Sequence, residues 1–154
     1  MLKRIHVYDV DGTLVDSSHR YRALPNGNVD LDHWIENHHR IGDDTLLPLA
    51  EQYRRDIADP STYVVICTLR TPQPADLQYI AQNLGMPDCL IMNSKNETEN
   101  LAGFKRRHLV RLFNLRQFAK LPRFFWEDSR AYVESCRDLF TRVYHVRSDQ
   151  EFTA

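Results

Sequence analysis

The stretch RIHVYDVDGTL at residues 4–14 decides the fold class of this chain. Residues 4–9 alternate apolar with polar or aromatic side chains and run directly into an Asp-Gly pair, which predicts a strand that ends at a turn. Asp9 and Asp11 are two positions apart, so in an extended chain their carboxylates point to the same side, about 6.6–6.8 Å apart along the strand. One phosphate group can lie between two such carboxylates, and Gly12 permits the sharp exit of the chain after them.

The two carboxylates suit a two-step transfer of a phosphoryl group. Asp9 is the expected nucleophile, which attacks phosphorus and forms an aspartyl-phosphate. Asp11 is the expected general acid and base, which protonates the leaving oxygen and later takes a proton from the hydrolytic water. A solvated turn or a calcium loop would also fit this motif. The calcium loop is disfavoured because no Glu closes a twelve-residue loop and no further carboxylates follow at its alternating positions.

Strand-like and helix-like segments alternate along the rest of the chain. Further strands are expected at residues 62–68, 89–92, 123–126 and 142–146. Apolar residues at helical spacing predict helices from Asp44 to Ile57, Leu77 to Leu84, Leu101 to Phe113 and Ser129 to Leu139. Asp43 or Asp44 is the expected cap of the first of these helices. Such alternation favours an α/β fold, in which a parallel sheet carries helices on both faces and ligands gather at the carboxyl ends of the strands.

Residues 17–43 interrupt this alternation. They contain Pro25, Gly27 and isolated aromatic residues without sustained periodicity, so we expect a small insertion or flap with a short helix near residues 31–38. No large cap domain is expected, and residues 1–154 should form a single domain around one core. An uncapped site would be open enough for the end of a polynucleotide, or for a partner that acts as a lid.

The composition excludes several classes of protein. The chain has 20 Lys and Arg against 21 Asp and Glu, so its net charge indicates neither a histone-like binder of polyanions nor an acidic disordered tail. Cys67, Cys89 and Cys136 are widely spaced among apolar neighbours, which suits buried thiols in a reducing compartment better than disulfide bonds. No window approaches the roughly 20 apolar residues of a membrane span, and we expect a soluble, cytoplasmic protein.

Thr68 and Arg70 follow the second predicted strand. A threonine hydroxyl can donate to a phosphoryl oxygen, and an arginine guanidinium can hold a phosphate through two parallel hydrogen bonds. The competing interpretation is a strand-end threonine and a surface arginine without function. If the parallel sheet is correct, both residues lie at the same edge of the sheet as Asp9.

Glu127 and Asp128 end the fourth predicted strand, directly after three aromatic residues. Two adjacent acids at the mouth of a buried strand are costly without a compensating cation, so a metal site is favoured over a surface turn. The expected cofactor is Mg²⁺, bound by a carboxylate of Asp9, the backbone carbonyl of Asp11, Asp128 and water. Whether Glu127 or Asp128 ligates the ion stays open.

A lysine is expected to oppose the negative charge that develops in the transition state. Lys105 lies at the start of the predicted helix from Leu101, with Phe104 beside it. Lys95 and Lys120 are competing candidates, of which Lys120 lies in a linker just before a strand. We favour Lys105 on the basis of its position in the helix.

Taken together, these residues resemble the haloacid dehalogenase-type phosphatases. That family has a strand ending in D-x-D-G-T, a second strand ending in Ser or Thr, a Lys at the start of a later helix, and a strand ending in an acidic pair. The matching residues here are Asp9 with Asp11, Thr68, Lys105, and Glu127 with Asp128, in this order along nearly the whole chain. The resemblance implies a Rossmann-like sheet of five parallel strands in the order 3-2-1-4-5 and a Mg²⁺-dependent phosphomonoester hydrolase.

Within that family the chain looks most like the phosphatase domain of phage-type polynucleotide kinase-phosphatases and their stand-alone relatives. The likeness rests on DVDGTLVDSSHR at residues 9–20, Trp34, T-L-R at residues 68–70 and FFWEDSR at residues 124–130. Two positions depart from this likeness. Glu127 stands where the relatives often have Asp, and Leu69 stands where they usually have the Gly of the phosphate loop. Substrate contacts are expected from Arg70, Gly12, Thr13, Ser18, His19, Arg20 and Trp34.

The identity of the substrate is less well defined than the reaction. Residues 101–125 contain seven Lys and Arg and no acidic residue, which suits either a nucleic-acid backbone or a solvated face that balances acids elsewhere. Tyr21 and Trp34 can stack a base or anchor the insertion to the core. We expect a polynucleotide 3′-phosphatase, with a nucleotidase acting on (deoxy)nucleoside monophosphates as the alternative.

A catalytically silent nucleic-acid binding module is a third interpretation. A kinase activity is disfavoured because the chain has no G-x-x-x-x-G-K loop. The partners we expect are a phosphorylated nucleic acid end or a nucleotide, and no membrane. A homodimer is allowed by these observations but not required.

Overall fold

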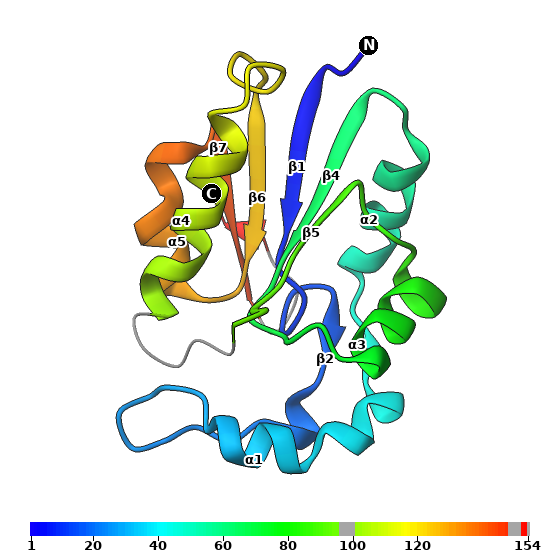
Figure 1. Cartoon of the computed structure of the whole chain (residues 1–154), viewed down its shortest axis with the longest axis vertical. Coiled ribbons are helices and arrows are strands. Elements are labelled where there is room, and N and C mark those ends of the chain that lie inside the picture. Colours follow the sequence, from blue (N-terminus) through cyan, green and yellow to red (C-terminus); the bar gives the residue numbers. More distant parts are fainter. Residues whose placement is uncertain (96–100, 148–151, 154) are drawn as a thin grey trace.

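The computed structural model describes residues 1–95, 101–147 and 152–153. Its centre is a six-stranded sheet in the order β5-β4-β1-β6-β7-β8 (Figure 1). The strands are β1 (Arg4–Tyr8), β4 (Thr62–Cys67), β5 (Cys89–Ile91), β6 (Arg123–Glu127), β7 (Arg142–Val146) and β8 (Phe152–Thr153). The first five run parallel, whereas β8 pairs antiparallel with β7.

The order of the parallel strands is the one expected. Strands β5, β4, β1, β6 and β7 are the third, second, first, fourth and fifth predicted strands, so the order 3-2-1-4-5 is confirmed. The central strand β1 pairs on both sides, with Val7 opposite Val65 of β4 and Phe125 of β6. The edge strand β8 was not expected.

Helices cover both faces of the sheet. They are α2 (Leu49–Ala58), α3 (Pro74–Tyr79), α4 (Leu101–Phe113) and α5 (Arg130–Cys136). A π-helical turn over Ile80–Leu84 extends α3, and a 3₁₀ turn over Arg137–Leu139 extends α5. In Figure 1, α2 and α3 lie on one side of the sheet and α4 and α5 lie on the other.

Alternation of side chains along the strands divides the core into two layers. Tyr8 belongs to the layer that contains Tyr53 of α2, and Val7 belongs to the layer that contains Leu109 of α4. Each layer removes apolar surface from water, which stabilises the fold by roughly 25 cal/mol per Å². The sheet is therefore held from both faces, and the carboxyl ends of its strands are fixed relative to one another.

Residues 17–43 lie beyond the carboxyl ends of the parallel strands, at the bottom of Figure 1. They contain a 3₁₀ turn at Ser18–Arg20, α1 (Leu31–Glu36) and a second 3₁₀ segment at His38–Asp43. The short helix expected in this insertion is therefore present. Asp30 caps it, because its carboxylate accepts from the amide of His33 at 3.0 Å.

The start of the helix expected from Asp44 was wrong. Helix α2 begins at Leu49, because residues Thr45–Leu46 form strand β3, which pairs antiparallel with β2 (Val15–Asp16). Asp44 does not cap the helix, since its carboxylate is bound by arginine side chains. Tertiary contacts thus override the local capping pattern.

In the described ranges, no helix combines the length and the apolar character that crossing a membrane requires. All three cysteines are free thiols, and Cys67 and Cys136 are buried. Burial raises the pKa of the Cys67 thiol, which keeps it neutral. The single domain expected over residues 1–154 stays a prediction, because residues 96–100, 148–151 and 154 lie outside the described part.

Candidate functional site

The predicted nucleophile Asp9 lies one residue past β1. Its amide donates to the carbonyl of Trp126 at 3.0 Å, so the pairing with β6 continues as far as Asp9. The chain then turns, because the Val10 carbonyl accepts from three of the amides that follow. Gly12 has a φ of 77° in this turn, a left-handed conformation that glycine adopts without strain. Asp9 and Asp11 therefore do not share one extended strand, and the spacing derived from strand geometry does not apply.

Lys105 provides the positive charge next to Asp9. Its Nζ donates to Asp9 Oδ1 at 2.7 Å and to Glu127 Oε2 at 2.6 Å. The side chain extends from the first turns of α4 and is 2% exposed. The competing candidates Lys95 and Lys120 are both exposed at the surface.

Asp128 completes an acidic cluster around this lysine. Ligand oxygens of Asp9, Glu127 and Asp128 lie within 4.8 Å of one another. A Cβ atom on Gly12 would lie 2.2 Å from Asp128 Oδ2, so glycine is needed to leave room for that carboxylate. Three carboxylates that face one lysine leave a surplus of negative charge, and their oxygen atoms are the ligands that Mg²⁺ prefers.

Glu127 and Asp128 have different surroundings although they are adjacent. Glu127 is buried, and both of its carboxylate oxygens accept hydrogen bonds, Oε2 from Lys105 and Oε1 from the amide of Ser129 at 3.0 Å. Asp128 is exposed and its carboxylate faces Gly12. Asp128 is thus the acid better able to turn toward a cation.

The electrostatics of the cluster reflect the crowding of acids. Burial, followed by the charge of Asp9, raises the pKa of Glu127 to about 7, although Lys105 opposes the shift. Desolvation and the charges of Asp9 and Glu127 also raise the pKa of Asp128. Burial alone would lower the pKa of Lys105, but the charges of Asp9 and Glu127 raise it well above its ordinary value. Lys105 is therefore charged, and it does not by itself neutralise the acids around it.

Two threonine hydroxyls belong to the same edge of the sheet. Thr13 Oγ1 donates to Asp9 Oδ2 at 3.1 Å. Thr68 follows β4, which pairs with β1, and its Oγ1 accepts from the amide of Arg70 at 3.1 Å. Because the Thr68 oxygen acts as an acceptor in that contact, its hydrogen can be donated to a phosphoryl oxygen.

Asp11 belongs to a second group of charged residues. Its carboxylate accepts from Arg70 Nη2 at 2.7 Å, from Arg70 Nε at 3.0 Å and from Ser17 Oγ at 2.7 Å. Arg70 also donates to Asp44 at 2.9 Å and to Asp76 at 3.4 Å. Burial would raise the pKa of Asp11, but the charge and hydrogen bonds of Arg70 lower it. Arg70 was expected to grip phosphate, whereas its guanidinium here binds three carboxylates.

Most of the insertion residues expected to contact substrate lie in this second group. His19 Nε2 and Arg20 Nε both bind Asp44 Oδ1, at 2.8 and 2.9 Å. The guanidinium carbon of Arg20 lies 3.8 Å from the centre of the Trp34 ring, so Trp34 stacks on Arg20. Ser18 is exposed.

Four residues of the two groups were missed by the sequence analysis, namely Asp44, Asp76, His38 and Tyr132. Asp76 is buried on α3 and binds His38 Nε2 at 2.7 Å, while Tyr132 presents its ring to Lys105 Nζ at 4.7 Å. Asp44 and Asp76 each look like an acid at a helix start, which is an ordinary position for a solvated carboxylate. Nothing local in the sequence distinguishes them from such residues.

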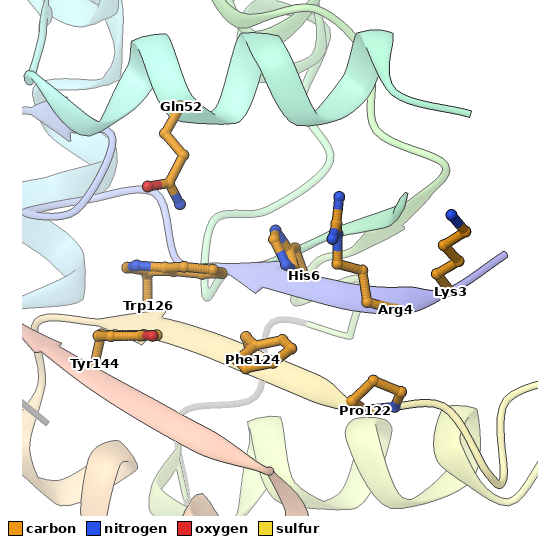
Figure 2. Close-up of a pocket in the computed structure, with 8 residues that line it drawn as sticks. All are labelled: Lys3, Arg4, His6, Gln52, Pro122, Phe124, Trp126 and Tyr144. Atoms are coloured by element: carbon orange, nitrogen blue, oxygen red, sulfur yellow. The ribbon is translucent and has the colours of Figure 1, made fainter. Parts of the chain in front are cut away.

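A separate cavity of about 380 Å³ lies on the face of the sheet that α2 partly covers (Figure 2). Its lining includes Lys3, His6, Gln52, Phe124, Trp126 and Tyr144. Trp126 stacks between Tyr8 and Tyr144, with ring centres 4.7 and 5.0 Å apart, so both faces of the indole are covered. None of the clustered acids lines this cavity, so it is not the candidate active site.

The chain matches a known protein family over most of its length. The family described as bacteriophage T5 5′-deoxynucleotidase matches residues 1–144. The 5′-deoxynucleotidase of Escherichia phage T5 is 34% identical over 84 residues, which are 51% of this chain and 34% of that protein. The match therefore spans about a third of the length of this relative.

Solved structures share the fold at low sequence identity. The Pnkp1/Rnl/Hen1 RNA repair complex contains a chain with a TM-score of 0.68 and 19% identity, over 95% of this chain and 43% of that one. A predicted HAD-like family hydrolase from Porphyromonas gingivalis has a TM-score of 0.53 and 13% identity, over 94% of this chain and 91% of that one. The fold expected from the resemblance to haloacid dehalogenase-type phosphatases is thus shared with a HAD-like structure, and the chain belongs to the bacteriophage T5 5′-deoxynucleotidase family.

Proposed function

We propose that this protein is a Mg²⁺-dependent phosphomonoester hydrolase that releases phosphate from deoxynucleoside 5′-monophosphates through an aspartyl-phosphate. The observation that carries the proposal is the cluster of Asp9, Glu127 and Asp128 near the buried cation Lys105. This cluster lies where a parallel α/β sheet collects its ligands. Its surplus negative charge suits a divalent cation that in turn binds a phosphate.

Asp9 and Asp128, with the backbone carbonyl of Asp11, would hold the Mg²⁺ ion, and Glu127 lies beside them. The bound ion would screen the repulsion between carboxylates and phosphate. Lys105 and Thr13 each hold one oxygen of Asp9, which orients the carboxylate for attack on phosphorus. The charge of Lys105 also opposes the charge that develops on the phosphoryl group.

Asp11 is the proposed general acid and base, because it lies two residues from Asp9 on the same turn. Thr68 is the proposed donor to a phosphoryl oxygen, and the backbone around Gly12 and Thr13 forms the wall next to it. Ser18 is exposed at the start of the insertion and remains a candidate for contact with the substrate.

The choice of a deoxynucleoside 5′-monophosphate follows the family match and the phage T5 relative, which is a 5′-deoxynucleotidase. A polynucleotide 3′-phosphatase is the second candidate. It is favoured by the fold shared with a chain of an RNA repair complex, and by the exposed cations Arg111, Arg116 and Lys120 on and after α4. A homodimer, which the sequence allows but does not require, can be checked by sedimentation.

A turnover screen tests both candidates. Purified protein with and without Mg²⁺ is given deoxynucleoside 5′-monophosphates, 3′- and 5′-phosphorylated oligonucleotides and p-nitrophenyl phosphate, and released phosphate is measured. We expect Mg²⁺-dependent release, fastest from the 5′-monophosphates. Preference for 3′-phosphorylated oligonucleotides would select the second candidate, and release from none of the esters would contradict both.

Asp9→Asn provides the matched test of the nucleophile. The amide cannot form the aspartyl-phosphate, so activity should fall by at least about 10³-fold. Asp138→Asn is the control, because Asp138 is an exposed acid whose carboxylate binds Arg106 away from the cluster. Full activity of Asp9→Asn would remove Asp9 as the nucleophile.

A further inference from the structure

Asp44 is a buried carboxylate that joins three separate parts of the chain. Its Oδ1 accepts from His19 Nε2 and Arg20 Nε, and its Oδ2 accepts from Arg20 Nη2 at 2.8 Å and Arg70 Nη2 at 2.9 Å. Its backbone carbonyl accepts from the hydroxyl of Tyr79 at 2.8 Å. One aspartate thus ties the insertion, the loop after β4 and helix α3 together.

The contacts continue from Asp44 to the proposed general acid. The Nη2 atom of Arg70 that binds Asp44 also donates to Asp11 at 2.7 Å. The Arg70 side chain is 1% exposed, so its guanidinium is held by protein groups rather than by water. The position of Asp11 therefore depends on Arg70, and the position of Arg70 depends in part on Asp44.

A second series of contacts runs from Asp44 into the insertion. The Arg20 side chain is fully buried, its guanidinium is paired with Asp44, and Trp34 stacks on it. Removing one partner from a buried ionic network leaves uncompensated charge, so the remaining groups must move. Without the charge of Asp44, two neighbouring guanidinium groups would repel each other, and Arg20 would no longer hold Trp34 in place.

We infer that Asp44 is a positioning residue, which holds Arg70 against Asp11 and the insertion against the strand ends without touching the substrate. The inference rests on the proposed function, in which Asp11 protonates the leaving group. Asp44→Asn keeps the shape of the side chain, but its NH₂ group cannot accept from a guanidinium. Arg20 or Arg70 must then lose its hydrogen bond.

The first test uses the identity of the leaving group. Departure of a nucleoside alkoxide needs a proton from Asp11, whereas p-nitrophenolate is stable without one. The ratio kcat/KM reports the steps up to formation of the aspartyl-phosphate. In the Asp44→Asn variant, kcat/KM for the deoxynucleoside monophosphate should fall at least about tenfold more than kcat/KM for p-nitrophenyl phosphate. An equal fall for both esters would reduce Asp44 to a structural role and overturn the inference.

A double-mutant cycle tests whether Asp44 acts through Arg70. In an Arg70→Gln background, Asp44→Asn should have little further effect on the ratio of the two kcat/KM values, because the Arg70–Asp11 contact that Asp44 supports is already absent. Additive effects would contradict the inference. Asp59→Asn is the matched control, since Asp59 also accepts from several donors, including Arg4 and Thr62, at the opposite end of the sheet. Asp59→Asn should leave the ratio of the kcat/KM values for the two esters unchanged.

A third measurement does not depend on activity. The chain has two tryptophans, so Trp126→Phe leaves Trp34 as the single fluorescent indole. Asp44→Asn in this background should raise acrylamide quenching of Trp34 at least about twofold, because Arg20 is released from the ring. If wild-type protein hydrolyses none of the esters, the proposed function fails and this measurement alone decides whether Asp44 holds the insertion. Unchanged quenching would overturn that role.

Discussion

The Lys105 centre and the Arg70 network are two charged groups at the same end of the molecule, each around a buried cation, and they differ in charge balance. In the Lys105 centre, the three acids Asp9, Glu127 and Asp128 face one lysine. In the Arg70 network, the three acids Asp11, Asp44 and Asp76 face two arginines and two histidines. The first group has three acids for one lysine. The second has three acids for two arginines, and histidine nitrogens also bind two of its acids, so its charges are closer to balance.

This difference separates a site that binds a ligand from a scaffold. A buried network in which donors and acceptors are matched is rigid and gains little from another ion. A cluster with surplus charge is costly by itself and gains from a cation that neutralises it. The charge surplus therefore supports the proposal that the Lys105 centre binds Mg²⁺ and phosphate, with the Arg70 network holding the groups around it.

The largest expected effect comes from removing the central cation of each group. Lys105→Met and Arg70→Met should each lower the free energy of unfolding by about 3–5 kcal/mol in metal-free buffer, because each leaves buried carboxylates unpaired. Mg²⁺ should recover part of this loss in Lys105→Met, where it can replace the missing charge, and not in Arg70→Met. Urea unfolding with and without Mg²⁺ measures both. Equal recovery in the two variants would contradict the difference in charge balance between the Lys105 centre and the Arg70 network.

The next effect concerns the two adjacent acids of the Lys105 centre. Asp128→Asn should raise the Mg²⁺ concentration needed for half-maximal activity by about 10- to 100-fold, because it removes a proposed ligand. Glu127→Gln should raise it less, since both Glu127 oxygens already accept from protein donors. Titration of activity with Mg²⁺ ranks the two variants. The reverse order would make Glu127 the metal ligand.

A smaller effect is expected at Gly12. Gly12→Ala should cost about 1–2 kcal/mol of stability, because an alanine at a φ of 77° is strained. The added methyl group would also lie 2.2 Å from Asp128 Oδ2 and displace that carboxylate, so the variant should need more Mg²⁺ than wild type. Thermal unfolding and Mg²⁺ titration test the two parts separately. Wild-type Mg²⁺ dependence in Gly12→Ala would show that Asp128 does not need its position beside Gly12 to support Mg²⁺ binding.

The last effect is a pH dependence of opposite sign in the two groups. The pKa of Glu127 is raised from 4.5 to about 7, so the folded state retains a proton in this range and metal-free stability should fall as pH rises through it. The pKa of Asp11 is lowered below 3.8, so its contribution is present above that pH and is lost as pH falls through the lowered value.

Chemical unfolding of metal-free protein across this pH range measures these slopes. Glu127→Gln should reduce the fall between pH 4.5 and 7 to the part that Asp128, whose pKa is also raised, contributes, whereas Asp11→Asn should leave the fall unchanged. The slope should also be reduced by Mg²⁺, because the ion favours the ionised acids. A slope that is undiminished in Glu127→Gln would assign the pH dependence to another group.

The sequence was sufficient to predict the sheet and the acids at its edge. Alternating apolar residues, short strand lengths and the Asp-Gly turn predicted the five parallel strands, and the resemblance predicted their order. Lys105 was also correctly placed beside Asp9, because its position in the first turns of a helix is a local property. The strands β2, β3 and β8 were not predicted, since two-residue strands have no recognisable period.

The Arg70 network could not be predicted in the same way. Asp43 or Asp44 was interpreted as a helix cap, and Arg70 and Arg20 were expected to contact the substrate. In the structure the carboxylate of Asp44 accepts from both arginines. Which acid an arginine binds depends on distances between segments that are far apart in the chain, and these are set only when the insertion packs on the strand ends.

The sequence by itself determined which residues stand at the ends of the strands, because strand periodicity and turn chemistry are local. It also led us to expect a cation beside them. Only the tertiary structure decided how those charges are shared between a centre with surplus negative charge and a balanced network, because Coulomb interactions act through space and depend on burial. Asp9 and Asp11 show this most clearly. They are two residues apart, yet one binds Lys105 and the other binds Arg70.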